Sequence, residues 1–175
     1  VVVFYLFPVF IILAEPFVER RPLDRARAGI AFVALLGVAL VVGARFEGLD
    51  PRGLALALLA AFGAAIQFFA AARMPDTPNA AKLFWGHLLV LPGVVLTLAV
   101  TDGWRGPEIL GLAPWAVAIT LGAYVLSIAL QLHALARISA ATAGLAFCAE
   151  PIFATLFAAL LLGERLSMLQ AAGAA

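Results

Sequence analysis

The sequence has 175 residues, of which 65% are apolar and only 12% are charged, and its net charge is +1. A soluble domain of this length would carry charged residues at about twice this rate, so the composition indicates a membrane protein rather than a soluble domain. The nearly neutral charge provides no basic surface for nucleic acid, and the single cysteine, Cys148, cannot form an internal disulfide.

Long apolar runs divide the chain into predicted membrane spans. A spanning helix needs about 20 apolar residues, because about 30 Å of hydrocarbon is crossed at about 1.5 Å per residue. Six runs meet this standard, namely Val1–Val18, Ala28–Ala44, Gly53–Ala72, Ala81–Val100, Leu112–Ala134 and Ala140–Leu162. The tail from Met168 to Ala175 is typical of a further span that has only begun. The sequence therefore predicts an all-α polytopic transmembrane bundle, and its abrupt apolar ends predict a fragment of a longer protein.

Short connections rich in helix breakers separate the predicted spans and leave no room for a soluble domain. Within them, Asp50 stands before Pro51, and Ser139 stands before the run 141–144. Both are residue types that cap the first turn of a helix, and proline is favoured directly after such a cap. We therefore expect helices to start at these two points.

The distribution of Lys and Arg predicts the orientation, because cytoplasmic loops are enriched in both. With spans counted alternately, one side of the membrane receives seven basic residues and the other receives four. The richer side carries Arg20, Arg21, Arg25, Arg27, Arg73, Lys82 and Arg137, and the poorer side carries Arg45, Arg52, Arg105 and Arg165. We therefore expect a multi-pass protein of the cell inner (plasma) membrane with the Arg20–Arg27 loop in the cytoplasm.

An internal repeat relates the first and sixth spans. The stretch 7–24 matches the stretch 150–167 at a constant offset of 143 residues, which places Pro8 opposite Pro151. Five crossings separate these two prolines, and an odd number of crossings reverses the direction of the chain through the bilayer. The two copies are therefore predicted to be inverted, an arrangement that many secondary transporters use to expose one central site alternately to each side.

The end of the sixth span carries the most specific motif. Glu150-Pro151 is followed by Gly163-Glu164-Arg165-Leu166-Ser167. In these residues the chain resembles the EamA-type transporters of the drug/metabolite transporter superfamily. The resemblance implies two inverted five-helix repeats in a ten-helix protein with both termini in the cytoplasm. Residues 1–46 would then be the end of the first repeat, with two transmembrane helices, and residues 47–175 would be the second repeat with its last helix truncated.

The first copy departs from this motif at several positions. Arg20-Arg21 replaces Gly163-Glu164, and Phe7 stands in the place of Glu150. Glu15 and Pro16 are expected to interrupt the helix of the first copy. Because the two copies differ in this way, we expect any ligand site between them to be asymmetric.

Glu150 is the principal candidate site residue. It lies about 13 residues beyond Arg137 and thus near the middle of its span, where an exposed carboxylate would cost several kcal/mol. One interpretation is a substrate contact or a protonatable coupling group that faces a cavity. The other is a structural glutamate that joins two helices beside the backbone group left unpaired by Pro151. Pro8 and Pro151 are the predicted helix hinges.

Other polar residues inside the spans are secondary candidates. Gln67, His87 and Gln131 lie within roughly four to seven residues of the predicted cytoplasmic ends, where such groups can line a vestibule and orient polar substrate atoms. Glutamines can instead form hydrogen bonds between helices. Tyr124, in mid-span, can line a cavity or pack with its hydroxyl bonded to a neighbour. Glu15 is predicted to lie at the interface.

These features predict a secondary transporter that moves a small organic metabolite or a drug-like compound by alternating access, with export favoured over uptake. Two alternatives stay open: an intramembrane enzyme that acts on a lipid through Glu150 and His87, and a noncatalytic membrane scaffold. The sequence contains no metal-binding spacing, phosphate loop or catalytic triad, so no enzyme activity, metal or cofactor is expected.

The expected partners are the lipid bilayer and a small-molecule substrate, with proton coupling as an option. Small residues four positions apart, such as Ala118 and Gly122, permit close packing of helices. In a chain this rich in Ala and Gly, such pairs favour packing within the chain, and a homodimer stays an alternative.

Overall fold

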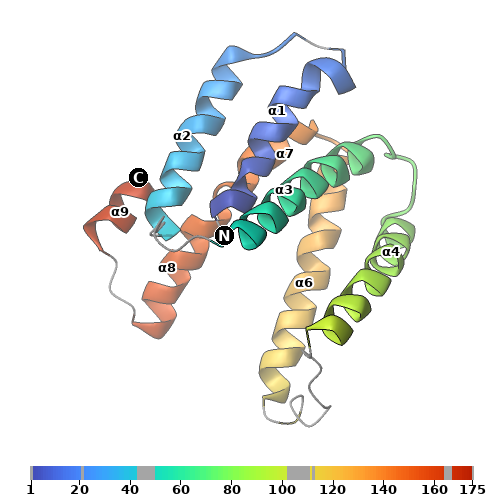
Figure 1. Ribbon diagram of the computed structural model, residues 1–175, viewed down its shortest axis with the longest axis vertical. Coiled ribbons are helices and arrows are strands. Elements are labelled where there is room, and N and C mark those ends of the chain that lie inside the picture. Colours follow the sequence, from blue (N-terminus) through green and yellow to red (C-terminus); the bar gives the residue numbers. More distant parts are fainter. Residues whose placement is uncertain are drawn as a thin grey trace. The chain divides into compact units, whose positions relative to one another are not determined.

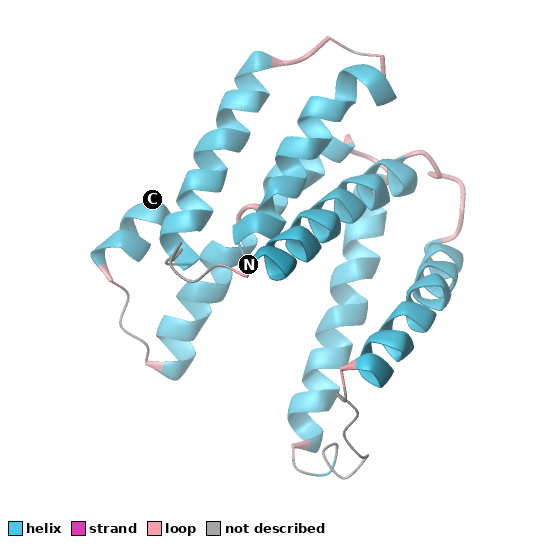
Figure 2. Cartoon of the chain, viewed as in Figure 1, coloured by secondary structure: helices cyan, strands magenta, loops and turns pink. Residues whose placement is uncertain are grey.

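The computed structural model describes residues 2–20, 22–42, 50–101, 111, 113–163 and 167–174. Every regular element in these ranges is a helix (Figures 1 and 2). The elements are η1 (Val2–Leu6), α1 (Phe7–Val18), α2 (Arg25–Val42), α3 (Pro51–Ala72), α4 (Asn79–Val100), α6 (Pro114–Leu135), α7 (Ala140–Phe147), α8 (Glu150–Leu162) and α9 (Met168–Ala174). The predicted all-α fold class is confirmed.

Five helical segments of the described chain are long and apolar enough to cross a membrane: α2, α3, α4, α6 and the combined segment Ala140–Leu162. Each lies within a few residues of a predicted span. The first predicted span corresponds to the shorter apolar segment Val2–Val18. Because its opening turn is a 3-10 helix, which rises about 2.0 Å per residue, this segment still extends about 28 Å. Residues 43–49 and 102–110, which include most of two predicted connections, lie outside the described residues.

The chain packs as two compact units, one formed by Val1–Ala70 with Ile138–Ala175 and the other by Ala71–Arg137. In the first unit α2 packs against α9 and α1 packs against α7, whereas in the second unit α4 packs against α6. Packing units and sequence repeats are different divisions of a chain. The expected repeat boundary between residues 46 and 47 therefore stays a prediction.

Helix starts follow the predicted caps. Asp50 accepts hydrogen bonds from the backbone N–H groups of Arg52 and Gly53, both at 3.1 Å. The Ser139 hydroxyl oxygen accepts one from the N–H of Thr142 at 3.2 Å. Each cap satisfies an N–H group that the first turn of a helix leaves without an intrahelical partner. Both predicted helix starts are confirmed.

Two helices of the first unit begin directly before a proline. Helix α1 starts at Phe7, before Pro8, and α8 starts at Glu150, before Pro151. Proline is well suited to the first turn, because its missing N–H would have no partner there. The two starts are separated by 143 residues, which is the offset of the sequence repeat.

The same two helices are followed by a backbone in the left-handed conformation. Arg20 has φ +55° after α1, and Gly163 has φ +70° after α8. Glycine adopts this conformation freely, whereas an L-residue pays about 1–2 kcal/mol. Positions 20 and 163 are also 143 residues apart. Gly163 ends its helix as predicted, while Glu164 to Leu166 of the motif lie outside the described residues.

The helices that come next begin at matching caps. Asp24 accepts hydrogen bonds from the N–H groups of Ala26 and Arg27 at 2.9 and 3.1 Å, before α2. Ser167 and Gln170 form a reciprocal capping box before α9, with bonds of 3.2 and 2.9 Å. Asp24 and Ser167 are again 143 residues apart.

The expected interruption at Glu15 and Pro16 is wrong, because α1 continues through Pro16 to Val18. A proline inside a helix lacks the N–H that would bond four residues back. Here Pro16 lies in the last turn of α1, and the helix recovers at once, since the N–H of Glu19 bonds to the carbonyl of Glu15 at 2.8 Å.

Glycine permits two close helix contacts in the first unit. A Cβ on Gly173 of α9 would lie 2.7 Å from the carbonyl oxygen of Gly37 in α2, and these helices lie side by side (Figure 1). A Cβ on Gly144 of α7 would lie 3.0 Å from Ile11 and 3.5 Å from Pro8 in α1. In Figure 1, α1 runs in the opposite direction to α7 and α8. Small residues allow such approach of backbones in a lipid environment.

Candidate functional site

A break in the predicted sixth span determines where Glu150 stands. Helix α7 ends at Phe147, and the N–H groups of Cys148 and Ala149 bond to carbonyls three residues back, at 3.0 and 3.1 Å. Regular bonding resumes when the N–H of Phe153 bonds to the carbonyl of Ala149 at 3.0 Å. The break follows from Pro151, which cannot supply the N–H that a continuous helix would need. Glu150 is therefore the first residue of α8.

The Glu150 side chain is exposed on the described chain and has a specific neighbour. The phenol of Tyr5 lies near its carboxylate and interacts with it electrostatically. Tyr5 belongs to η1 and is only 7% exposed, and the 6% exposed Cys148 also lies close to it. A buried tyrosine normally has a hydrogen-bond partner for its hydroxyl. The site therefore joins Glu150 to the 3-10 turn that precedes Pro8.

Tyr5 was not predicted from the sequence, although the sequence contained a signal. Tyr5 lies 143 residues before Cys148, so the two residues are equivalent in the repeat. Each stands shortly before the proline that begins a helix, Pro8 after Tyr5 and Pro151 after Cys148. What the repeat alone did not provide was the proximity of the Tyr5 side chain to Glu150.

Aromatic rings pack next to this break. The centroids of Phe7 and Phe68 are 5.2 Å apart, those of Phe68 and Phe147 are 5.3 Å apart, and those of Phe7 and Phe147 are 6.3 Å apart. Phe7 is 2% exposed and Phe68 is 3% exposed. Such edge-on and tilted pairs are favourable beyond their burial alone. The cluster joins η1–α1, α3 and α7 into a rigid apolar support beside Glu150 and Tyr5.

Both predicted hinges lie at this place. Pro8 and Pro151 are buried, and each follows the first residue of its helix. Pro8 contacts α7, because a Cβ added to Gly144 would lie 3.5 Å from its Cα. Proline at a helix start leaves the preceding turn without regular bonding, so both prolines stand where their spans are locally weakest.

The second unit brings together two other predicted residues, His87 of α4 and Tyr124 of α6. The His87 Nε2 atom lies 2.8 Å from the Tyr124 hydroxyl, and its Nδ1 atom lies 2.7 Å from the carbonyl of Leu83. A carbonyl can only accept, so Nδ1 carries a proton. In the neutral ring Nε2 is then the acceptor, and the Tyr124 hydroxyl donates to it. Tyr124 was predicted to bond to a neighbour or to line a cavity, and its hydroxyl bonds to His87.

The two predicted glutamines lie in different units. Gln131 is half-buried on α6, two turns after Tyr124 and so on the same face of that helix. Gln67 is exposed near the end of α3, in the first unit. A vestibule shared by Gln67, His87 and Gln131 therefore stays a prediction.

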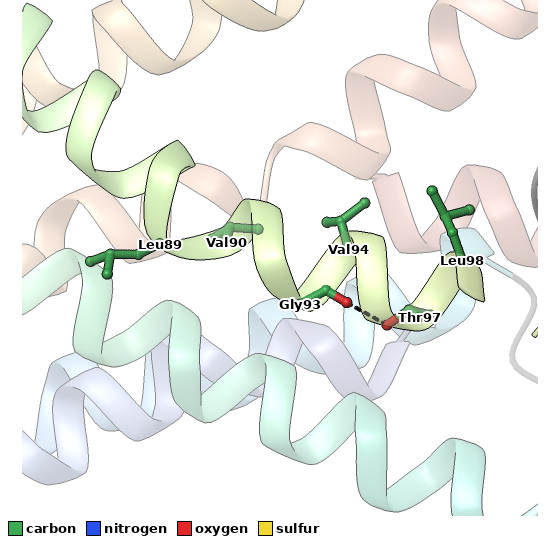
Figure 3. Close-up of a pocket in the computed structure, with 6 residues that line it drawn as sticks. All are labelled: Leu89, Val90, Gly93, Val94, Thr97 and Leu98. Atoms are coloured by element: carbon green, nitrogen blue, oxygen red, sulfur yellow. Dashed lines mark hydrogen bonds between the residues drawn. The ribbon is translucent and has the colours of Figure 1, made fainter. Parts of the chain in front are cut away.

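A shallow apolar depression of about 520 Å³ follows one side of α4. Its lining residues are Leu89, Val90, Gly93, Val94, Thr97 and Leu98 (Figure 3). The Thr97 hydroxyl donates to the carbonyl of Gly93 at 2.8 Å and is thereby satisfied within the helix. All the lining residues belong to α4. Among them, the only polar side chain is that of Thr97, which is already bonded to Gly93. Within the described ranges, no group of three or more His, Cys, Asp or Glu residues is placed to hold a metal ion.

The fold and these sites define a class: a polytopic α-helical membrane protein whose broken spans carry polar groups in otherwise apolar surroundings. Irregular backbone at membrane depth is tolerated only where protein or a cavity surrounds it, which is typical of transporters.

Residues 51–175 match the EamA-like transporter family, and the chain belongs to that family. It is a membrane transporter of the drug/metabolite transporter superfamily, and its helices contact the lipid bilayer. The matched region includes α3 to α9 and thus Glu150, His87 and Tyr124. No curated protein and no solved structure matches the chain significantly.

Proposed function

We propose that this protein is a secondary transporter that exports a small organic metabolite or drug-like compound by alternating access, with Glu150 as the residue that contacts the substrate or a coupling proton. The observation that carries the proposal is the position of Glu150 at the break between α7 and α8, next to the phenol of the buried Tyr5. A carboxylate at a helix break, next to a partner from another segment, is positioned for binding rather than merely tolerated.

The proposal includes an inverted repeat, with residues 1–46 as the end of one unit and 47–175 as the next. Four pairs of backbone features share the 143-residue offset and support it: the starts of α1 and α8, the left-handed residues Arg20 and Gly163, the caps Asp24 and Ser167, and the starts of α2 and α9. The opposite directions of α1 and α8 in Figure 1 agree with inversion.

The position of Glu150 relative to the repeat favours a central site. Tyr5 and Cys148 are equivalent under the 143-residue offset, and their side chains lie close to each other. If a pseudo-two-fold axis relates the proposed repeats, a residue near its own equivalent lies near that axis. Inverted-repeat transporters bind their substrates near that axis and near the membrane midplane. Glu150, whose equivalent is Phe7, makes the site asymmetric.

A carboxylate in this position needs a compensating group throughout the transport cycle. Ionised carboxylates in hydrocarbon cost several kcal/mol, so Glu150 must face water, a cation, a proton or a hydrogen-bond donor. The Tyr5 hydroxyl is one such donor nearby. A substrate amine or a proton then supplies the second interaction in the loaded state, which couples binding to the geometry of the two breaks.

His87 and Tyr124 are proposed as a separate polar station within the second unit. The His87 Nε2 atom is bonded to the Tyr124 hydroxyl, so it can bind a polar substrate atom only when that bond opens. Gln131, on the Tyr124 face of α6, extends the station, and Gln67 is proposed to line the opening toward the cytoplasm. The Arg20–Arg27 loop is proposed to lie in the cytoplasm of a cell whose inner membrane holds the protein.

The test begins with a search for the substrate. Purified full-length protein is screened for thermal stabilisation by amino acids, metabolites and drug-like amines, because a ligand that binds only the native state raises the unfolding temperature. A stabilising compound is then followed in reconstituted vesicles, at several values of pH, for wild type and for Glu150→Gln, Tyr5→Phe and Pro151→Ala.

We expect Glu150→Gln to reduce the transport rate about tenfold or more and to flatten its pH dependence, because a charge-assisted contact is worth about 1.5–3 kcal/mol. Asp76→Asn is the matched control, since this acid is exposed in the turn between α3 and α4. Unchanged rate and pH dependence in Glu150→Gln, together with a silent Pro151→Ala, would refute the proposal.

A further inference from the structure

One buried charge is not used by the proposed transport site. Among the described residues, Glu15 is the charged residue that is buried, with 3% of its surface exposed. It lies in the last turns of α1, at the position that was predicted to be interfacial. Burial of a carboxylate is costly unless a partner of opposite charge compensates it. The partner is Arg27 of α2, whose Nη1 atom lies 3.5 Å from the Glu15 carboxylate.

A second acid holds Arg27 in place. Its Nε atom lies 3.2 Å from Asp24, whose other carboxylate oxygen caps α2. The Arg27 side chain is 40% exposed. Beside it is an open pocket of about 370 Å³ lined by Glu15, Pro22, Leu23, Asp24 and Arg27. In this ion pair the Glu15 carboxylate is buried, whereas water can reach the Arg27 guanidinium. If the pair opens, the guanidinium is therefore hydrated and does not stay buried without a partner.

The network exists in one copy of the proposed repeat only. At the 143-residue offset, Ala158, Ser167 and Gln170 stand in place of Glu15, Asp24 and Arg27. Gln170 donates instead to the carbonyl of Val41 in α2, at 3.3 Å. Thus α9 is joined to α2 by a neutral hydrogen bond and by the Gly37–Gly173 contact, whereas α1 is joined to α2 by an ion pair at the edge of a pocket.

We propose that the pair Glu15–Arg27, oriented by Asp24, is a one-sided latch that holds the end of α1 against α2 and stabilises the conformation closed on that side of the membrane. The inference rests on the proposed alternating access. Helices α2 and α9 form the fixed pair, and α1 moves relative to them from its start at Pro8. The absence of such a pair at Ala158 makes the two closed conformations unequal in free energy.

The native Cys148 provides the readout, because it lies beside Tyr5 and Glu150 at the proposed axis. Full-length protein in right-side-out and inside-out vesicles is treated with a membrane-impermeant, quaternary-ammonium methanethiosulfonate, and the rate of Cys148 modification is measured from each side. The variants are Glu15→Gln, Arg27→Gln and their combination. Arg25→Gln is the matched control, because it removes the same charge from an exposed position two residues away. Cys148→Ser corrects for any other labelling.

We expect Glu15→Gln and Arg27→Gln each to raise modification from the side of the 19–24 turn about three- to tenfold and to lower it from the other side. The double variant should equal the single variants, since both remove one interaction. Arg25→Gln should resemble wild type. Variants are compared at equal recovery of monodisperse protein. Arg27→Lys keeps the charge, so its ratio of Cys148 modification rates from the two sides should lie nearer the wild-type value than that of Arg27→Gln.

Two negative results are distinguishable. If Cys148 is modified from both sides at rates that neither Glu15→Gln nor Arg27→Gln changes, or if Arg25→Gln changes them equally, the latch is refuted while alternating access stands. If Cys148 is modified from one side only in wild type and in every variant, both the latch and alternating access are refuted.

Discussion

At the scale of single residues, Arg20 is the least expected feature. It adopts φ +55° at a position where the second copy has Gly163 at φ +70°. The left-handed conformation ends a helix well, but it brings the Cβ of an L-residue close to the following carbonyl. The first copy therefore keeps the left-handed conformation at this position and carries its cost in an arginine that also contributes to the basic loop.

Arg20→Gly should consequently stabilise the protein, by about 0.5–1 kcal/mol, because the relief of strain exceeds the entropy that glycine adds to the unfolded chain. Thermal unfolding in detergent measures the effect. Arg20→Ala removes the same charge but keeps a Cβ, so it should give no gain. An equal gain from both substitutions would assign the effect to charge rather than to backbone conformation.

Tyr5 provides a second prediction at this scale. Tyr5→Phe removes the hydroxyl that lies near Glu150 and leaves the buried ring in place, and we expect it to weaken substrate binding about five- to tenfold. The thermal shift with the identified substrate measures this. In a Glu150→Gln background the same change should have a smaller effect, because the charge that the hydroxyl interacts with is already lost. Equal effects in both backgrounds would contradict a coupling of the two side chains.

At the scale of elements, the packing of α2 against α9 depends on glycine. The space between Gly37 and Gly173 admits no Cβ, since one added to Gly173 would lie 2.6 Å from Leu40 and 2.7 Å from the Gly37 carbonyl. In lipid, helices associate through such close packing rather than through the exclusion of water. This contact, together with the hydrogen bond from Gln170 to Val41, holds the two helices in close contact.

Gly173→Ala should therefore destabilise the protein by about 1–3 kcal/mol, the usual cost of inserting a methyl group into a packed contact. Gly29→Ala is the matched control, because this glycine also lies on α2 but a Cβ there meets nothing within 4 Å. It should be neutral or stabilising by up to about 1 kcal/mol. Unfolding in detergent compares them, and equal stabilities would contradict a glycine-dependent contact.

At the scale of the whole molecule, the alternation of spans fixes which loops share a side of the membrane. The described segments reproduce the predicted order of spans, so the 19–24 turn and the turn between α3 and α4 should lie on one side and the start of α9 on the other. Because basic residues are more frequent on the first side, we expect that side to face the cytoplasm.

Labelling of single cysteines tests this assignment. In a Cys148→Ser background, Leu23→Cys and Met74→Cys should react with an impermeant maleimide only in inside-out vesicles, and Met168→Cys should react in right-side-out vesicles. These side chains are 42%, 42% and 93% exposed, so access within the protein does not limit the reaction. Reaction of Leu23→Cys from the outside would reverse the orientation, and different sides for Leu23 and Met74 would contradict the topology.

The sequence by itself determined the helical spans, their order, the caps at Asp50 and Ser139, and the family motif from Glu150 to Ser167. These features are local: a run of apolar residues, a capping side chain or a proline acts within a few residues of its own position. The same locality explains why the continuation of α1 through Pro16 was missed, since the cost of one lost hydrogen bond in a last turn is small and packing decides the outcome.

The tertiary structure alone decided which distant groups meet. Tyr5 and Glu150, His87 and Tyr124, and Glu15 and Arg27 are joined by packing between helices, and no periodicity or motif in the sequence encodes those distances. Glu15 illustrates the physical reason. Its place one turn before the end of α1 predicted an interfacial acid, but whether the side chain is buried depends on the neighbouring helix. Only the approach of α2 with Arg27 makes a buried carboxylate tolerable there.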